Sequence, residues 1–130
     1  MNLLLILAGA IGLFGGWAHL YLGERWTIGP LRAEVLDSYK FKGEVNKRIV
    51  RWFWHIGSMV LLSTSALLLA HGLGWIQVHR QLLLFISFQW LSITALWVLF
   101  AGKPPTRFFT IFPGLIGIPV NLLILAGSWP

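Results

Sequence analysis

The sequence contains no cysteine, which excludes disulfide bonds and thiolate metal sites. It also carries little charge: Asp, Glu, Lys and Arg make up 11% of the 130 residues, whereas a soluble domain has about a quarter. Only four residues are acidic, and all of them fall outside the long apolar segments. Proton- and cation-coupled carriers rely on acidic side chains within the membrane, so the sequence disfavours this class.

Four long segments have no charged residue at all: 3–22, 53–70, 82–101 and 108–127. Each is long enough to cross a hydrocarbon core of about 30 Å, which takes about 20 helical residues. Lipid offers the backbone no hydrogen-bond partners, so such segments must be helical. We predict one all-α transmembrane domain over residues 1–130, an up-down four-helix bundle with a cytoplasmic loop at 23–44 and helices near 3–22, 45–71, 81–101 and 107–128.

The distribution of basic residues predicts the orientation. The net charge of +6 would also suit nucleic acid, but nine of the ten Lys and Arg residues lie in the first and third connections, and only Arg80 lies on the opposite side. This positive-inside pattern predicts a multi-pass protein of the inner (plasma) membrane with both termini outside. The expected partner of the basic loops is the anionic surface of the lipid bilayer, with no nucleic acid involved. We expect the first segment to be a retained helix, because no basic residue precedes it.

The connections also carry local signals. Pro30 is suited to start a short interfacial helix near 30–38 in the first loop. The second connection, at 71–75, is short and rich in glycine, so we expect the second and third helices to pair as an antiparallel hairpin. In the first helix Ala8, Gly12 and Gly16 recur every four residues, a pattern that lets helix backbones approach closely. His19 lies on the same stripe and should therefore face protein.

His19 and His55 are the main candidate functional residues. Each lies three or four residues inside the cytoplasmic end of its helix, on the order of 5 Å below the interface. An ionisable side chain at such a depth usually has a function. The simplest interpretation is a structural hydrogen bond to a neighbouring helix.

Three ligand-binding interpretations stand beside the structural one. The two imidazoles could ligate haem b, with Arg48 and Arg51 near its propionates. They could instead bind a quinone or relay a proton. A divalent metal could be held by His19, His55 and Glu24, although zinc prefers three or four ligands and no HxxxH pair is present. His71 and His79 lie in or beside the outer connection, where we expect them to be solvated.

Other polar residues fall deep within the later apolar segments, namely Gln89, Ser92 and Asn121. Such residues usually form interhelical hydrogen bonds of about 1 kcal/mol, although they could line a polar path. Pro119 lies within the fourth segment and could interrupt its helix, as at some transport sites. A second interrupted helix, which transporters of this kind have, is missing.

The first half of the chain contains the run His19-Leu-Tyr-Leu-Gly23-Glu24-Arg25 and a later Trp54-His55 pair. In these features it resembles a loose group of small bacterial membrane proteins that carry an H-x-x-x-G-E-R segment and a W-H pair. The resemblance implies a four-helix membrane architecture and groups His19, Glu24, Arg25 and His55 together. It implies no particular activity.

Two hypotheses of different classes follow, with a third behind them. We expect a non-enzymatic accessory or structural subunit of a larger membrane assembly, formed with other membrane subunits or with copies of itself. The alternative is a redox protein that binds haem b or a quinone through His19 and His55. A small transporter or channel is the third.

Overall fold

The computed structural model describes residues 1–38, 41–100 and 112–129, and all regular structure within these ranges is helical. This confirms the predicted all-α class with four long helices. The long helices are α1 (Leu3–Leu22), α2 (Gly43–Leu73), α3 (Arg80–Phe100) and α5 (Phe112–Gly127). The predicted start of the last helix at residue 107 lies outside the described residues.

Two of these helices are long and apolar enough to cross a membrane. They are α1 with its continuation, Leu3–Ile28, and α2, Gly43–Leu73. Shorter apolar helical stretches cover Arg80–Leu96 and Ile116–Gly127. By length and composition, the structure therefore has two candidate membrane spans.

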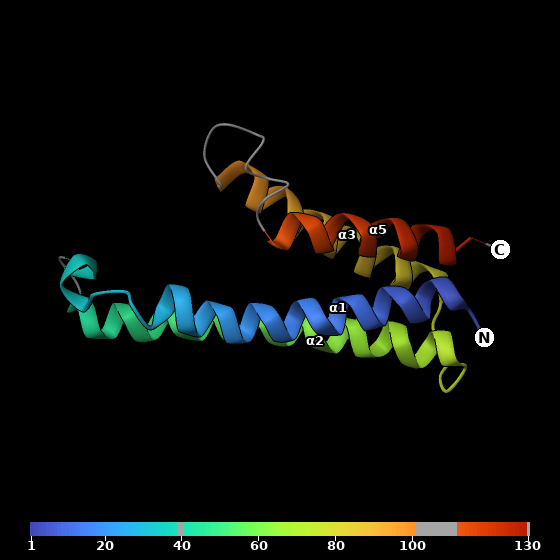
Figure 1. Ribbon diagram of the computed structural model, residues 1–130, viewed down its shortest axis with the longest axis horizontal. Helices are drawn as coiled ribbons and strands as arrows, with labels where there is room; N and C mark the ends of the chain where they lie inside the picture. Colours follow the sequence, from blue (N-terminus) through green and yellow to red (C-terminus); the bar gives the residue numbers. More distant parts are fainter. Residues whose placement is uncertain (39–40, 101–111, 130) are drawn as a thin grey trace.

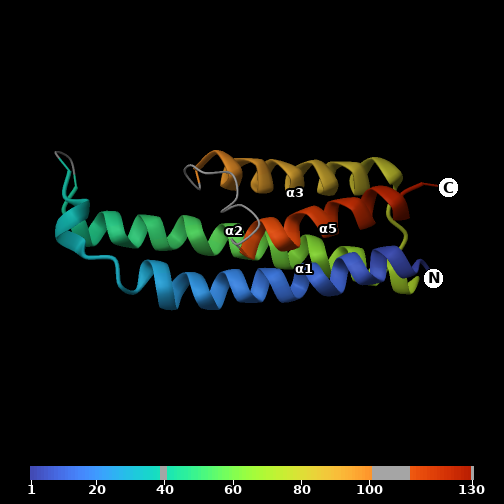
Figure 2. The same cartoon turned by 45° about the horizontal axis from the view of Figure 1, so that its top comes forward.

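Their contacts place the helices in the order α2, α1, α5, α3. α1 and α2 lie side by side along their length (Figures 1 and 2), and α5 lies against both α1 and α3. Contacts between α2 and α3 are few, so the tight hairpin predicted from their short connection is wrong. The reason is that α5 packs closely against both α1 and α3. Ile116 of α5 contacts Gly15 of α1, and Gly117 of α5 contacts Thr94 of α3.

Glycines form the seam between α1 and α2. A Cβ atom added to Gly9 would lie 2.6 Å from the Leu69 backbone nitrogen, and one added to Gly16 would lie 2.9 Å from the Leu62 side chain. At Gly12 it would collide with the Ser65 hydroxyl. Ala8, Gly12 and Gly16 are all buried, which confirms the predicted packing stripe.

Asn2 forms hydrogen bonds with the ends of three helices, α1, α2 and α5. Its backbone N–H donates to the Gly72 carbonyl at 2.8 Å, and its side-chain amide donates to the Gly127 carbonyl at 2.8 Å. Its side-chain oxygen accepts from Leu5 N–H at 3.3 Å and caps α1. Both chain termini therefore lie at one end of the molecule, opposite the first loop (Figure 1).

The first loop differs from its prediction. α1 ends at Leu22, as predicted, but a π-helical turn, η1 (Gly23–Ile28), follows it directly and ends where Gly29 meets Pro30. Proline lacks a backbone N–H and disfavours a helical conformation in the residue before it. The predicted interfacial helix near 30–38 is reduced to one 3₁₀ turn, η2 (Ala33–Leu36).

The remainder of the first loop is held to the start of α2. The Asn46 side-chain amide donates to the Leu36 carbonyl at 2.6 Å, and the Gly43 N–H donates to Asp37 Oδ1 at 2.5 Å. These local bonds satisfy the loop backbone and explain why a longer helix does not form.

The glycine seam generates a stability prediction. We expect Gly9→Ala to lower the free energy of unfolding by about 1–3 kcal/mol, because the new methyl group meets the backbone of α2. Gly57→Ala on α2 is the matched control: its Cβ meets nothing within 4 Å, so better helix propensity should raise stability by up to about 1 kcal/mol. Thermal unfolding of the detergent-purified variants measures both changes. Equal effects at the two positions would contradict the proposed role of the seam.

Candidate functional site

His19 lies in the contact between α1 and α2. It contacts α2 through its ring face, one ring nitrogen and its backbone carbonyl. Its Nδ1 is 2.8 Å from Ser58 Oγ. Its ring stacks on the Trp54 indole, with centroids 4.4 Å apart and planes 6° from parallel. Trp54 in turn donates its Nε1–H to the His19 carbonyl at 3.0 Å. The side chain therefore faces protein, as the stripe on α1 predicts.

The partners of Ser58 assign the proton on His19. The Ser58 hydroxyl donates to the Trp54 carbonyl at 3.1 Å, one turn back along α2. Because a hydroxyl has a single hydrogen, Ser58 can only accept from His19, so Nδ1 carries the N–H. Ser58 is completely buried, which excludes water as a substitute partner.

Gly23 makes this arrangement possible. It is buried, and a Cβ atom at this position would collide with the Trp54 indole nitrogen. Sequence reasoning placed His19 on the packing stripe of α1 but did not identify Trp54 as the side chain that fills the space beside Gly23. The signal was present: a glycine one turn beyond a histidine on a packing face indicates that a large side chain lies opposite.

Glu24 is directed toward α2 by the π-helical turn η1 and forms a bidentate ion pair with Arg51. The Arg51 Nη2 lies 2.8 Å from Glu24 Oε1, and its Nε donates to Oε2 at 3.2 Å. His55 joins the same carboxylate, with Nε2 3.5 Å from Oε2. Both members of the main pair are about 40% exposed, so the pair contributes at most about 1 kcal/mol.

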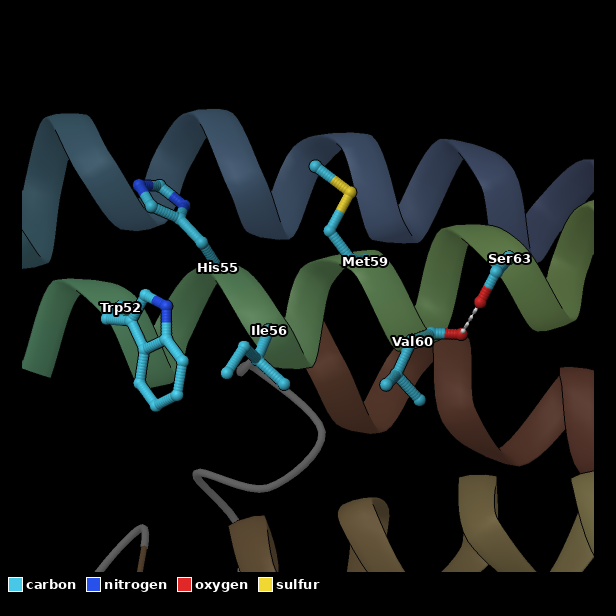
Figure 3. Close-up of a pocket in the computed structure, with 6 residues that line it drawn as sticks. All are labelled: Trp52, His55, Ile56, Met59, Val60 and Ser63. Carbon is cyan, nitrogen blue, oxygen red and sulfur yellow. Dashed lines mark hydrogen bonds between the residues drawn. The ribbon is translucent and has the colours of Figure 1, made fainter.

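His55 lies at the same level of the helix pair as His19. His19 contacts Trp54, the residue before His55, and Ser58, about one turn after it on α2. The two rings have different surroundings. His19 lies in the contact between α1 and α2, whereas His55 faces Glu24 at the edge of that contact and lines a surface groove on α2. Figure 3 shows His55 and Met59 reaching from α2 toward α1, with Trp52 and Ile56 on the other side.

One atom in this region has no partner. His55 Nδ1 is buried and is the one buried side-chain nitrogen or oxygen across the described ranges that makes no hydrogen bond. An unpaired buried group of this kind costs about 1–3 kcal/mol. His55 also lines a shallow, open groove of about 500 Å³ on the surface of α2, together with Trp52, Ile56, Met59, Val60 and Ser63.

The geometry does not fit a haem held between the two histidines. A macrocycle between the rings would have to separate α1 from α2, break the stack of His19 on Trp54 and break the bond to Ser58. Arg48, expected near the propionates, is exposed, and Arg51 is engaged by Glu24. For a divalent metal, no group of three His, Asp or Glu side chains suited to hold it occurs among the residues described.

The other predicted polar residues do not come together. Asn121 is buried and accepts from the Ser87 hydroxyl at 3.0 Å, while its amide donates to the Gly117 carbonyl at 3.0 Å. Ser92 donates to the carbonyl of Phe88 in its own helix, and Gln89 is half-buried. Pro119 lies inside α5, which is helical on both sides of it.

Two further contacts lie outside the predicted sites. Trp90 of α3 donates to the Thr64 hydroxyl of α2 at 3.3 Å. His71, expected to be solvated, has Nδ1 within 3.3 Å of the Val78 nitrogen and 3.1 Å of the Ile76 carbonyl oxygen. It therefore stabilises the turn that follows α2.

We expect Ser58→Ala to lower the free energy of unfolding by about 1–3 kcal/mol, because it removes the acceptor of the His19 N–H inside the α1–α2 contact. Ser63→Ala, one and a half turns along α2, is the control. Its exposed hydroxyl bonds only to the Val60 carbonyl of its own helix at 3.1 Å, so the change should stay within about 0.5 kcal/mol (Figure 3). Chemical or thermal unfolding of both variants in the same detergent makes the comparison. If the two serines prove equivalent, the His19–Ser58 bond does not stabilise the fold.

No family model, curated protein or solved structure matches the chain. The chemistry of the site therefore follows from its own geometry. Ser58, Trp54 and His19 join α1 to α2 inside the contact, and Glu24, Arg51 and His55 join them at its edge.

Proposed function

We propose that the protein is a multi-pass protein of the inner (plasma) membrane, an up-down bundle with both termini outside and the loop at 23–44 in the cytoplasm. The four charge-free segments and the nine-to-one division of basic residues support this orientation. The two candidate spans and the position of both termini at one end of the molecule agree with it (Figure 1).

Within the membrane, we propose that it serves as a non-enzymatic accessory or structural subunit of a larger assembly. The observation that carries this proposal is that the most conspicuous polar residues bond to one another. His19, Ser58 and Trp54 bond to one another across the α1–α2 contact, and Glu24 and Arg51 form an ion pair across its edge. Groups engaged in this way stiffen a helix pair and are not free to act on a substrate.

The surface near this pair supports an interaction role. The end of α1 and α2 that carries η1 and η2 extends past α3 and α5 (Figure 2). Large exposed aromatic side chains gather along this end, namely Phe14, Trp17, Tyr21, Trp26, Trp52 and Phe53. Such an extended apolar surface suits contact with another membrane subunit as well as with lipid.

Two alternatives are less well supported. A haem b between His19 and His55 would need the helices to separate, as described above. A transporter or channel would need a continuous polar path, whereas Asn121 pairs with Ser87 and Ser92 bonds within its own helix.

The absence of cysteine makes the proposed orientation directly testable. A single cysteine at Glu34 in η2 or at Gln77 in the connection after α2 places a thiol at an exposed position on each side. In intact spheroplasts, a membrane-impermeant maleimide should label Gln77→Cys, and it should label Glu34→Cys only after permeabilisation. The reverse pattern would overturn the orientation, and equal labelling at both positions would overturn membrane insertion.

The subunit proposal predicts contacts at one end of the molecule. Phe53 on α2 and Phe85 on α3 are similarly exposed, at 63% and 62%, so they form a matched pair for a photoreactive phenylalanine analogue. In native membranes, the Phe53 position should give a discrete adduct with a different protein, and the Phe85 position should give lipid adducts. If neither position yields a protein adduct, the accessory role is contradicted, whereas an adduct with a second copy of this chain would identify the assembly as a homo-oligomer.

A further inference from the structure

Trp17, Tyr21 and Arg25 form a continuous row of side chains along α1 and the start of η1. They lie four residues apart, a spacing that makes side chains neighbours on a helix. The Trp17 and Tyr21 rings stack with centroids 5.4 Å apart and planes 1° from parallel. The Arg25 Nη1 donates to the Tyr21 hydroxyl at 2.8 Å. All three side chains are exposed, so the row lies outside the α1–α2 contact.

Arg25 is oriented by this row, but its charge is not neutralised. The neighbouring Glu24 turns to α2 and pairs with Arg51 at 2.8 Å. In the described ranges, no carboxylate forms an ion pair with Arg25. A guanidinium carries several N–H donors, and the Tyr21 hydroxyl takes only one of them. Arg25 therefore presents a positive charge and unused donors in a fixed place.

The proposed orientation places this row at the cytoplasmic boundary of the membrane. α1 begins at Leu3, at the end where both termini lie. At 1.5 Å per residue, Trp17 lies roughly 21 Å and Arg25 roughly 33 Å beyond Leu3. The hydrocarbon core is about 30 Å thick. The guanidinium therefore reaches the headgroup layer, while the stacked rings lie within the edge of the hydrocarbon.

The chemistry of the row fits a phospholipid with a negatively charged headgroup. A guanidinium matches the paired oxygens of a phosphate, and the Tyr21 hydroxyl, which accepts from Arg25, keeps its own hydrogen for a second bond. The stacked rings offer a flat apolar surface to the glycerol and the upper acyl chain. The described residues 23–38 and 41–51 hold six Lys and Arg against four Asp and Glu, a surplus that disfavours a cationic choline group.

We propose that this row binds one anionic phospholipid of the cytoplasmic leaflet. Its phosphate accepts from Arg25 and from the Tyr21 hydroxyl, and its upper chain packs on the stack of Trp17 and Tyr21. This goes beyond the general attraction of basic loops for an anionic surface, because it assigns the binding to one of several cations. The site rests on the proposed membrane insertion and is independent of the accessory role.

Two lipids with the same acyl chains test the headgroup preference in the intact chain. Native mass spectrometry of the detergent-purified protein follows the first lipid adduct as dioleoylphosphatidylglycerol or dioleoylphosphatidylcholine is added. The phosphatidylglycerol should bind about fivefold more tightly, because its headgroup has no cation to face the basic surplus. Equal affinities would overturn the proposal. Glycerophosphoglycerol, the same headgroup without chains, should not displace the lipid at equal concentration, and displacement would show that the site takes a free phosphate instead.

Substitution then distinguishes one site from diffuse attraction. Arg25→Gln should weaken the first phosphatidylglycerol adduct about tenfold, because it removes the charged donor to the phosphate. Arg48→Gln is the matched control, since it removes the same charge from an exposed arginine at the same end of the molecule. Its effect should stay within about twofold. Equal weakening by the two substitutions, or no weakening by Arg25→Gln, would overturn the site.

Tyr21→Phe tests the hydrogen bond that orients Arg25. The variant keeps the aromatic ring for the stack on Trp17 but loses the hydroxyl. Phosphatidylglycerol binding should weaken about threefold, while phosphatidylcholine binding stays unchanged. An equal loss for both lipids would contradict the role of the hydroxyl at the phosphate, as would no loss for either. Because the maleimide labelling reports insertion separately, the expected labelling pattern without a lipid preference would overturn the lipid site alone.

Discussion

The close approach of α1 to α2 is the constraint on which the other features depend. Where Gly9, Gly12 and Gly16 face Leu69, Ser65 and Leu62, no side chain of α1 separates the two backbones. In the proposed membrane setting, association of apolar helices gains little from the hydrophobic effect, so close packing and interhelical hydrogen bonds must stabilise the pair. The glycine seam supplies the packing, and it brings α2 near enough for the hydrogen bonds of His19 to form.

The same closeness limits what the two histidines can do. His19 is held between the helices, where the Trp54 ring covers one face and Ser58 accepts its N–H. A cofactor could reach this ring only by separating the helices and so breaking the seam. His55 escapes this limit because it sits on the flank of α2, about 100° around the helix from Trp54. Lying at the same level of the helix pair therefore does not make the two rings equivalent.

Sequence reasoning succeeded where the signal is local and periodic. Charge-free segments identify the four helices, and the spacing of Ala8, Gly12 and Gly16 identifies the packing face with His19 on it. It failed where the outcome depends on how two surfaces fit. The position of α5 between α1 and α3 depends on Gly15 against Ile116 and on Gly117 against Thr94, which no single helix reveals. The π-helical turn was missed for a related reason, because its hydrogen-bond register leaves no period in the residue pattern.

In the candidate site, too, the local signal could be predicted from the sequence and the fit between helices could not. An ionisable residue in an apolar run can be recognised from sequence, but its partners depend on the rotation of the opposing helix. Once that rotation is known, the arrangement of donors and acceptors follows from counting hydrogens. Ser58 gives its one hydrogen to the Trp54 carbonyl, so His19 must be the donor to Ser58. At the edge of the contact, His55 Nε2 faces the Glu24 carboxylate at 3.5 Å, while its Nδ1 makes no hydrogen bond within the described residues. The polar residues that stand out in the sequence therefore bond mainly to one another, and in doing so they hold α1 against α2.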